Sequence, residues 1–282
     1  MAVSPRIACL SVDMEPDLRD PEKRIRLLDD DARMQNLADL LRRENVPLTS
    51  FTVMSHARRY LDRLNAFARS ATVELAVHSF SHDTANPASD DEVRRARETF
   101  VELWGMQPRG YRTPNCLIDD RGIETLARYG FSYDSSIVPS VRPDAYAYNN
   151  LGFGRDPFWF ETPSGPLLEL PIACLAGIRL PLIFSYVKLF GLTTYRAAMQ
   201  AFGLPDIVVT YFHPYDLYIE DVAHNIPGWK RHVHRRNGRR AFALLEQLIA
   251  MLKRRGYTFA TMADVAAQLQ GRDLRMHRLS VA

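Results

Sequence analysis

The chain has 282 residues, of which 46% are hydrophobic and 24% charged, and its formal net charge is +3. This hydrophobic content can supply a buried core and excludes a chain that is disordered over most of its length. The three cysteines, Cys9, Cys116 and Cys174, have no paired spacing, so neither a disulfide framework nor a cysteine zinc site is expected. The N-terminal apolar run has only the length of a strand, which predicts a cytoplasmic protein without a signal peptide.

Strands and helices alternate in the first part of the chain. Apolar runs predict strands at 7–12, 48–53 and 73–77, with helices between them that end near residues 45 and 64. This order is typical of an α/β protein with a parallel sheet or barrel, in which functional residues follow the C-terminal ends of the strands.

The middle of the chain continues the alternation less regularly. Helices are predicted at 90–105 and 119–129, a strand and its exit at 109–115, and a further extended run at 131–136. The segment 138–166 is rich in proline, glycine, asparagine and aromatic residues, which predicts a long loop near the mouth of a site.

The last part of the chain begins with an apolar segment at 172–192. Arg179, Pro181 and Lys188 interrupt this segment, which argues against a spanning helix and favours an exposed flap that could contact a membrane peripherally. The elements expected after it are a strand at 207–212, a basic loop at 230–240, an amphipathic helix at 240–255, a strand at 257–261 and a helix at 264–269. Residues 1–270 are thus interpreted as one domain, followed by a frayed basic tail at 271–282.

Two histidines, His78 and His82, follow the predicted strand at 73–77 and are four residues apart. If the chain turns helically after Val77, both imidazoles lie on one face and can converge on a cation. Alone, such a pair is more often two ordinary polar residues.

Other candidate groups also follow predicted strands, namely Asp13, Glu15, Arg112 and His213. One of the two carboxylates could complete a two-histidine, one-carboxylate metal set with an open position for water, while the other takes the proton of that water. His213 could then protonate the departing nitrogen.

Five short motifs in this order resemble those of the polysaccharide deacetylases of the NodB-homology type, carbohydrate esterase family 4. They are Ser11 to Glu15, His78 to His82, Arg112 to Pro114, Phe131 to Ser136 and Tyr211 to Asp216. The resemblance covers residues 7–269 and implies a single-domain, distorted and incomplete (β/α)7-type barrel. The implied reaction is metal-dependent hydrolysis of an N-acetyl or similar acyl group on an amino sugar.

The resemblance also implies roles for single residues. Asp13 would be the general base, Arg112 the group that orients it, and His213 the general acid. His78 and His82 would bind one divalent metal ion, with zinc favoured and cobalt, nickel or manganese as alternatives.

Glu15 is assigned as the third metal ligand because it lies two residues after Asp13, where both side chains share one face of a strand. Asp13 remains open as the ligand in its place.

Three residues are assigned to substrate binding, namely Asn115, Tyr215 and Trp159. Asn115 replaces the aromatic residue that the family usually has after its proline, so its backbone N–H is assigned to the acyl oxygen. The family's aspartate-tryptophan motif is not recognisable, and Asp156 and Trp159 are the nearby candidates. The partner of His213 is left unassigned.

The expected substrate is an N-acylated amino sugar, linked to a nucleotide or a lipid rather than part of a finished polymer. The alternatives are an allantoinase-like or cyclic-imide hydrolase and a catalytically silent carbohydrate-binding barrel. The basic run Lys230 to Arg236 belongs to no nucleic-acid-binding module, so its default interpretation is a solvated face, and attraction to a substrate phosphate or an anionic membrane is the alternative.

Overall fold

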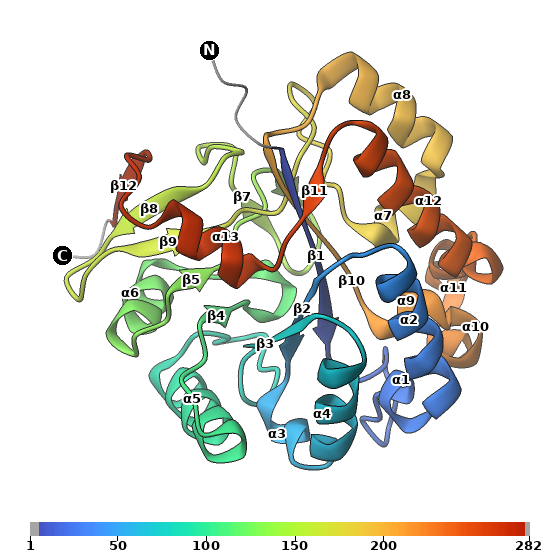
Figure 1. The fold of residues 1–282 in the computed structure, drawn as a ribbon, viewed down its shortest axis with the longest axis horizontal. Coiled ribbons are helices and arrows are strands. Elements are labelled where there is room, and N and C mark those ends of the chain that lie inside the picture. The colour runs from blue at the N-terminus through green and yellow to red at the C-terminus, as the bar shows by residue number, and fades with distance from the viewer. Residues whose placement is uncertain (1–5, 280–282) are drawn as a thin grey trace.

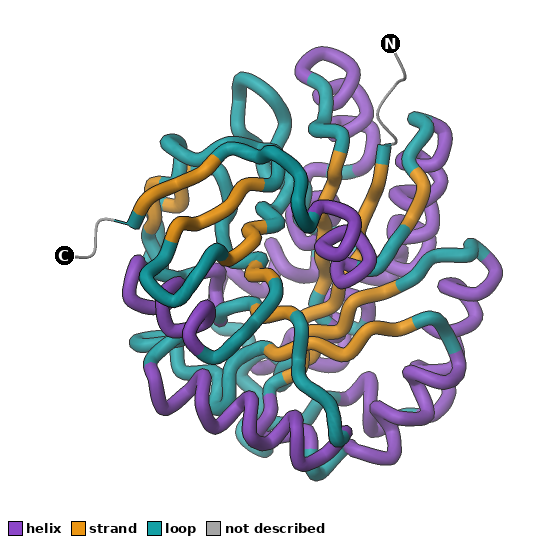
Figure 2. Tube along the Cα trace, turned by 60° about the vertical axis from the view of Figure 1, so that its left-hand side comes forward, coloured by secondary structure: helices purple, strands orange, loops and turns teal. Residues whose placement is uncertain are grey.

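The computed structural model describes residues 6–279 as a ten-stranded sheet that curls into an incomplete barrel surrounded by helices (Figures 1 and 2). The strand order is β10-β1-β2-β3-β4-β5-β9-β8-β12, and β11 pairs with β1. Where a barrel would close, the chain after β9 contacts β10 through an isolated bridge between Ile172 and Val209. The predicted fold class, an incomplete barrel of the NodB-homology kind, is confirmed.

Four parallel strands form the centre of the sheet. They are β1 (Ile7–Met14), β2 (Leu48–Thr52), β3 (Val73–Val77) and β10 (Ile207–Phe212). Each was predicted within two residues of its observed ends. Their register aligns the C-terminal ends at one edge, because Val12 pairs with Phe212 and Thr52 with Val77.

The remaining strands are short. They are β4 (Gly110–Tyr111), β5 (Tyr133–Asp134), β8 (Phe158–Glu161), β9 (Leu167–Glu169), β11 (Thr258–Phe259) and β12 (Met276–Arg278), with a separate hairpin of β6 (Val141–Arg142) and β7 (Tyr148–Asn149). The segment predicted as one long loop therefore contains three strands. The predicted frayed tail is wrong at 276–278, because β12 pairs with β8; residues 280–282 lie outside the described part.

Helices cover the outside of the sheet (Figure 2). They are α1 (Arg26–Asp29), α2 (Asp31–Arg43), α3 (Met54–Ala57), α4 (Leu61–Ser70), α5 (Asp90–Trp104), α6 (Asp120–Arg128), α7 (Phe184–Phe190), α8 (Leu192–Phe202), α9 (Pro214–Leu217), α10 (Ile219–Val222), α11 (Gly228–Arg235), α12 (Ala241–Arg254) and α13 (Met262–Leu269), with 3-10 turns η1 (Pro114–Cys116), η2 (Ala223–Asn225) and η3 (Gly238–Arg240). The basic segment predicted as a loop is therefore mostly the helix α11 and the turn η3.

The alternation of β1 determines which side chains reach the site. Leu10 and Val12 belong to the core cluster under the outer helices, whereas Cys9 belongs to a second cluster inside the barrel. Since side chains alternate along a strand, Ser11 and Asp13 share the inner face with Cys9. The inner face therefore carries buried polar groups among its apolar side chains, namely Ser11 and, near the C-terminal end of the strand, Asp13.

The apolar segment 172–192 is mostly buried rather than an exposed flap. Its large exposed apolar side chains are Ile178 and Phe190, so any contact of this segment with a lipid surface would fall to those two residues. Among residues 6–279, no helix is long and apolar enough to cross a membrane.

Candidate active site

The candidate residues meet at the C-terminal edge of the parallel strands. Asp13 is the penultimate residue of β1, and Glu15 directly follows this strand. His78, Arg112 and His213 directly follow the last residues of β3, β4 and β10, respectively. All five are at least largely buried, and Arg112 is fully inaccessible to solvent. The sequence thus placed these residues at one edge, and the structure brings them together.

Glu15, His78 and His82 form a set that could hold a metal ion. One ligand atom from each residue lies within 4.8 Å of the others. Glu15 Oε2 is 2.6 Å from His82 Nε2 and 3.3 Å from His78 Nε2. His78 Nδ1 donates to the Arg112 carbonyl oxygen at 2.9 Å, which leaves the Nε2 lone pair directed at Glu15. Two neutral imidazoles and a carboxylate fit a divalent cation such as zinc.

The backbone that joins the two histidines is a loop and not the helical turn expected from their spacing. Ser79 and His82 both have positive φ, of 59° and 65°. The His82 N–H donates to Ser79 Oγ at 3.1 Å, which closes the loop on itself. The two imidazoles therefore converge through a tight irregular turn.

Glu92 on α5 holds this loop in place through hydrogen bonds. Its carboxylate accepts from the Phe80 and Ser81 backbone N–H groups at 3.1 and 2.9 Å and from Ser81 Oγ at 2.7 Å. The sequence indicated only that Glu92 lies in the first turn of its helix. This supporting role depends on a contact between distant elements, for which the local pattern carries no signal.

Asp13 is held by Arg112 from inside the barrel. The Arg112 guanidinium donates to Asp13 Oδ1 at 2.7 Å and to the Ser135 carbonyl oxygen at 3.0 Å. It also lies between the rings of Phe51 and Tyr211, 4.2 and 4.9 Å from their centroids. Such contacts fix the guanidinium beside Asp13.

The partner of His213 is Asp216 rather than Asp156. His213 Nδ1 donates to Asp216 Oδ2 at 3.2 Å, and Lys188 Nζ donates to the Asp216 carbonyl oxygen at 2.8 Å and to Oδ1 at 3.3 Å. Burial alone would lower the pKa of His213, but the carboxylates of Glu15 and Asp216 outweigh it and raise the pKa to about 9. Burial likewise opposes ionisation of Asp216, but Lys188 and His213 lower its pKa below the ordinary value.

The three residues assigned to substrate binding have different positions. Tyr215 is buried, stacks on His213 at 4.7 Å and donates to Glu15 Oε1 at 3.3 Å, so it holds site residues in place. Asn115 lies in η1 with φ of 56° and is partly exposed. Trp159 lies on β8, and β9, β5 and β4 separate that strand from β3. The assignment of Trp159 to the site is therefore corrected.

A buried acid pair lies on β5 and β9, next to the elements that hold Arg112. Asp134 and Glu169 are register partners, and both are fully buried. Asp134 Oδ1 accepts from Ser136 Oγ at 2.7 Å, and Ser136 Oγ accepts from the Thr113 N–H at 2.9 Å. The second oxygens, Asp134 Oδ2 and Glu169 Oε2, have no hydrogen-bond partner among the described residues. Burial raises the pKa of both carboxyl groups, and the charge of Asp134 raises that of Glu169 further, which favours one proton shared by the pair.

Metal ligands, a carboxylate base and a histidine acid at one edge of a barrel are typical of metal-dependent hydrolases. Residues 17–133 match the family model of the polysaccharide deacetylases, and residues 135–267 match the model of a domain of unknown function, DUF3473. Residues 17–133 thus belong to the polysaccharide deacetylase family. No curated protein sequence matches it.

Solved structures with the same fold agree with this placement. A candidate polysaccharide deacetylase from Mycobacterium smegmatis has a TM-score of 0.62 at 20% identity, covering 100% of this chain and 96% of its own. PuuE allantoinase has a TM-score of 0.58 at 17% identity, covering 95% and 92%. A candidate polysaccharide deacetylase from Pseudomonas aeruginosa PAO1 has 0.54 at 20%, covering 94% and 91%. At these identities the likeness concerns the fold alone.

Proposed function

We propose that the protein is a metal-dependent N-deacetylase that removes an N-acetyl group from an amino sugar of a polysaccharide or of its nucleotide- or lipid-linked precursor. The observation that carries this proposal is the convergence of Glu15, His78 and His82, with Asp13 and His213 beside them. This is the set of groups that hydrolysis of an amide requires.

A divalent cation held by Glu15, His78 and His82 would activate a water molecule and polarise the acyl oxygen. Asp13 accepts a proton from the attacking water, and its ion pair with Arg112 orients the carboxylate for that task. The N–H of Asn115 is the donor that we assign to the acyl oxygen.

His213 donates its proton to the departing amine nitrogen. The carboxylate of Asp216 favours the protonated imidazole and orients the ring by accepting from Nδ1. The two proton-transfer groups thus differ in charge before reaction, as an acid and a base must.

Two alternative functions are compatible with the same fold. The first differs from the proposed deacetylase in its substrate, and the second differs in having no turnover. A hydrolase of allantoin or cyclic imides would use the same metal set on a different ring, and a silent carbohydrate-binding barrel would need no metal. All proposed ligand, acid and base positions are filled in this chain, which favours an active hydrolase.

The test measures bound zinc and acetate release for the wild type and for Asp13→Asn, Glu15→Ala and His78→Ala. We expect near-stoichiometric zinc in the wild type and in Asp13→Asn, and its loss in the other two. Acetate release should fall about 10²–10⁴-fold in Asp13→Asn, because the base is absent while the metal remains. The substrates are N-acetylated oligosaccharides, N-acetylated sugar nucleotides and allantoin.

Each contrary result has a distinct meaning. Zinc retained in Glu15→Ala would move the carboxylate ligand to Asp13, and faster turnover of allantoin would favour the cyclic-ureide hydrolase. Binding of oligosaccharides by wild-type protein that takes up no zinc would favour the silent barrel.

A further inference from the structure

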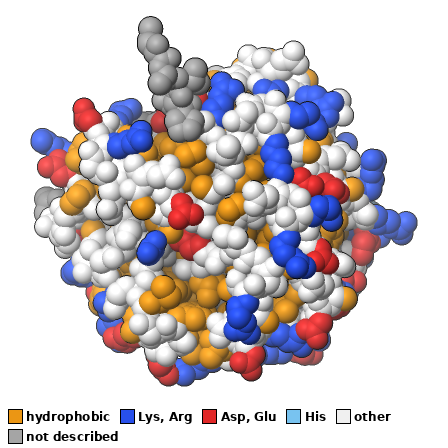
Figure 3. All heavy atoms as spheres, viewed as in Figure 1, with side chains coloured by type: hydrophobic (Ala, Val, Ile, Leu, Met, Phe, Trp, Pro, Cys, Tyr) orange, Lys and Arg blue, Asp and Glu red, His pale blue; other side chains and the backbone are white. Residues whose placement is uncertain are grey.

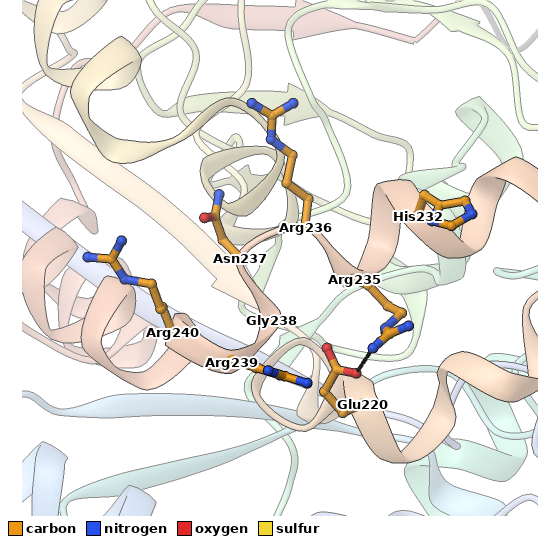
Figure 4. Close-up of a pocket in the computed structure, with 8 residues that line it drawn as sticks. All are labelled: Glu220, His232, Arg235, Arg236, Asn237, Gly238, Arg239 and Arg240. Carbon is orange, nitrogen blue, oxygen red and sulfur yellow. Dashed lines mark hydrogen bonds and ion pairs between the residues drawn. The ribbon is translucent and has the colours of Figure 1, made fainter.

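A concave surface outside the candidate active site gathers arginine side chains. The basic depression, as we call it, has a volume of about 450 Å³ and is formed by α10, α11 and η3 (Figure 4). It is lined by Glu220, His232, Arg235, Arg236, Asn237, Gly238, Arg239 and Arg240. Four arginines thus line one hollow with a single carboxylate.

The positive charge of the basic depression is only partly neutralised. Glu220 accepts from Arg235 Nε at 2.8 Å, and Figure 4 shows Arg239 on the same side. Within residues 6–279, no hydrogen bond or ion pair engages the guanidinium groups of Arg236, Arg239 or Arg240.

Elsewhere on the surface opposite charges are interspersed, as Figure 3 shows for one face. Arg94 and Arg95, for example, both pair with Asp91. Like charges that stay together without counter-charges repel each other in the folded protein, which disfavours such a cluster unless an anion joins it.

The floor of the basic depression is fixed to the fold. Asn237 has a left-handed backbone, and its side-chain amide donates to the Lys188 carbonyl oxygen at 2.6 Å. A Cβ atom on Gly238 would lie 2.3 Å from the Ile219 side chain, so η3 packs directly on α10. The arginines therefore project from a rigid turn and not from a free loop.

The same turn is connected to the candidate active site. Lys188, whose carbonyl oxygen binds Asn237, donates through its side chain to Asp216, and Asp216 in turn binds His213. The basic depression therefore adjoins the element that holds the proposed acid.

We propose that the basic depression binds a phosphate group. Guanidinium groups donate pairs of hydrogen bonds to phosphate oxygens, and three of them without counter-charges suit a doubly charged phosphate better than a singly charged carboxylate. The phosphate could belong to a soluble phosphate ester or to a lipid headgroup. Binding is the readout, so this proposal stands or falls independently of deacetylase activity.

The first experiment titrates the metal-loaded protein with glycerol 3-phosphate and follows binding by ³¹P NMR. We expect the dissociation constant of Arg236→Gln/Arg239→Gln to be at least tenfold higher than that of the wild type. The matched control, Arg69→Gln/Arg109→Gln, removes the same charge from exposed arginines outside the basic depression and should bind like the wild type. All variants keep the metal ligands, so any binding of glycerol 3-phosphate at the metal contributes equally to the wild type and to every variant.

A second variant should change affinity in the opposite direction. Glu220→Gln removes the one carboxylate of the basic depression and releases Arg235, so we expect tighter binding of glycerol 3-phosphate by at least threefold. Its control is Glu102→Gln, which also releases a surface arginine, Arg58, from an ion pair.

Vesicles distinguish the source of the phosphate. If the wild type sediments with phosphatidylglycerol vesicles but not with phosphatidylcholine vesicles, and Arg236→Gln/Arg239→Gln loses this sedimentation, the phosphate belongs to a lipid headgroup. Binding of glycerol 3-phosphate without vesicle binding would assign it to a soluble ester. Equal affinities of the arginine pair variant and its control, or no binding by the wild type, would overturn the proposal.

Discussion

His213 depends on a short series of buried groups for its charge and orientation. Lys188 binds Asp216, and Asp216 binds Nδ1 of His213. Tyr215 stacks on the imidazole of His213 and donates a hydrogen bond to Glu15. A buried cation behind the carboxylate keeps that carboxylate ionised, and the ionised carboxylate keeps the imidazole protonated. The proposed acid is thus supported by side chains of α7 and α9.

Replacing Asp216 with asparagine should weaken the proposed acid without removing it. The imidazolium would lose its ionised acceptor, so its pKa should fall, and we expect kcat to decrease about 10–100-fold. Steady-state kinetics of acetate release, measured between pH 6 and 9, would detect both effects, since the loss should grow as the pH rises.

The control is Ser185→Ala. Ser185 Oγ donates to Asp216 at 2.9 and 3.0 Å but does not contact His213, so its removal should change kcat little. Equal effects of the two variants would remove Asp216 as the partner of the acid.

At this scale the sequence identified the residues that carry strand-end chemistry and missed those that support them. Asp13, Glu15, Arg112 and His213 follow strands, so an aligned sheet brings them to one edge. Asp216 is only three residues after His213, but its side chain turns back toward His213 because Asp216 lies in the first turn of α9. The buried cation that binds Asp216 comes from a distant helix.

The loop between His78 and His82 shows how one element organises another. Glu92 stands in the first turn of α5, where Ser89 caps the helix by accepting the Glu92 N–H. The carboxylate is thereby directed at the backbone N–H groups of Phe80 and Ser81. The position of His82 is thus set by a helix that supplies no metal ligand.

Glu92→Gln should therefore lower metal affinity while the fold persists. The neutral amide oxygen accepts more weakly from the two backbone N–H groups than the carboxylate does, and the amide nitrogen cannot accept from the Ser81 hydroxyl, so we expect a 10–100-fold weaker zinc affinity. Competition with a chromogenic chelator measures it.

Glu98→Gln on the exposed side of α5 is the matched control, since Glu98 binds only Arg94. Unchanged zinc affinity in Glu92→Gln would show that the loop holds its conformation without this carboxylate.

Helices and strands could be predicted from the sequence where they are long enough for the repeat of apolar residues to be visible. The central strands have five or more residues, so an apolar run reveals them, whereas β4 and β5 have two residues each and were predicted only as parts of longer extended runs at 109–115 and 131–136. The helix α11 contains no buried residue, so its sequence has no apolar stripe and its charges suggested a loop. The strand β12 exists because β8 offers an edge, which is a property of the sheet.

Across the whole molecule, the two matched sequence regions share one sheet. β10 lies in the second region and pairs with β1, which precedes the first region, while β5 lies at the end of the first region and pairs with β9 of the second. The second junction contains the buried pair of Asp134 and Glu169. Burial, together with the neighbouring Asp134, raises the pKa of Glu169 well above its ordinary value.

Global stability should consequently depend on pH through Glu169. Folding takes up a proton at pH values above the unfolded pKa of roughly 4.3 and below the raised folded pKa, so wild-type stability falls with rising pH in that window by about 1.4 kcal/mol per unit. Glu169→Gln keeps a donor for Asp134 and does not titrate. Urea unfolding between pH 5 and 8 should show the variant gaining stability relative to wild type as the pH rises.

Glu161→Gln serves as the reference, because Glu161 is half exposed and pairs with Arg278 at the surface. Parallel pH profiles for Glu169→Gln and the wild type would mean that the pair holds no shared proton.

The central place of β1 has a consequence for synthesis on the ribosome. β1 is completed at residue 14, but its partners β10 and β11 begin at residues 207 and 258. At roughly 5–20 residues per second, β10 follows about 10–40 s later. A nascent chain that stalls before it therefore carries a mostly apolar strand with one edge unpaired, and such an edge can recruit a second chain.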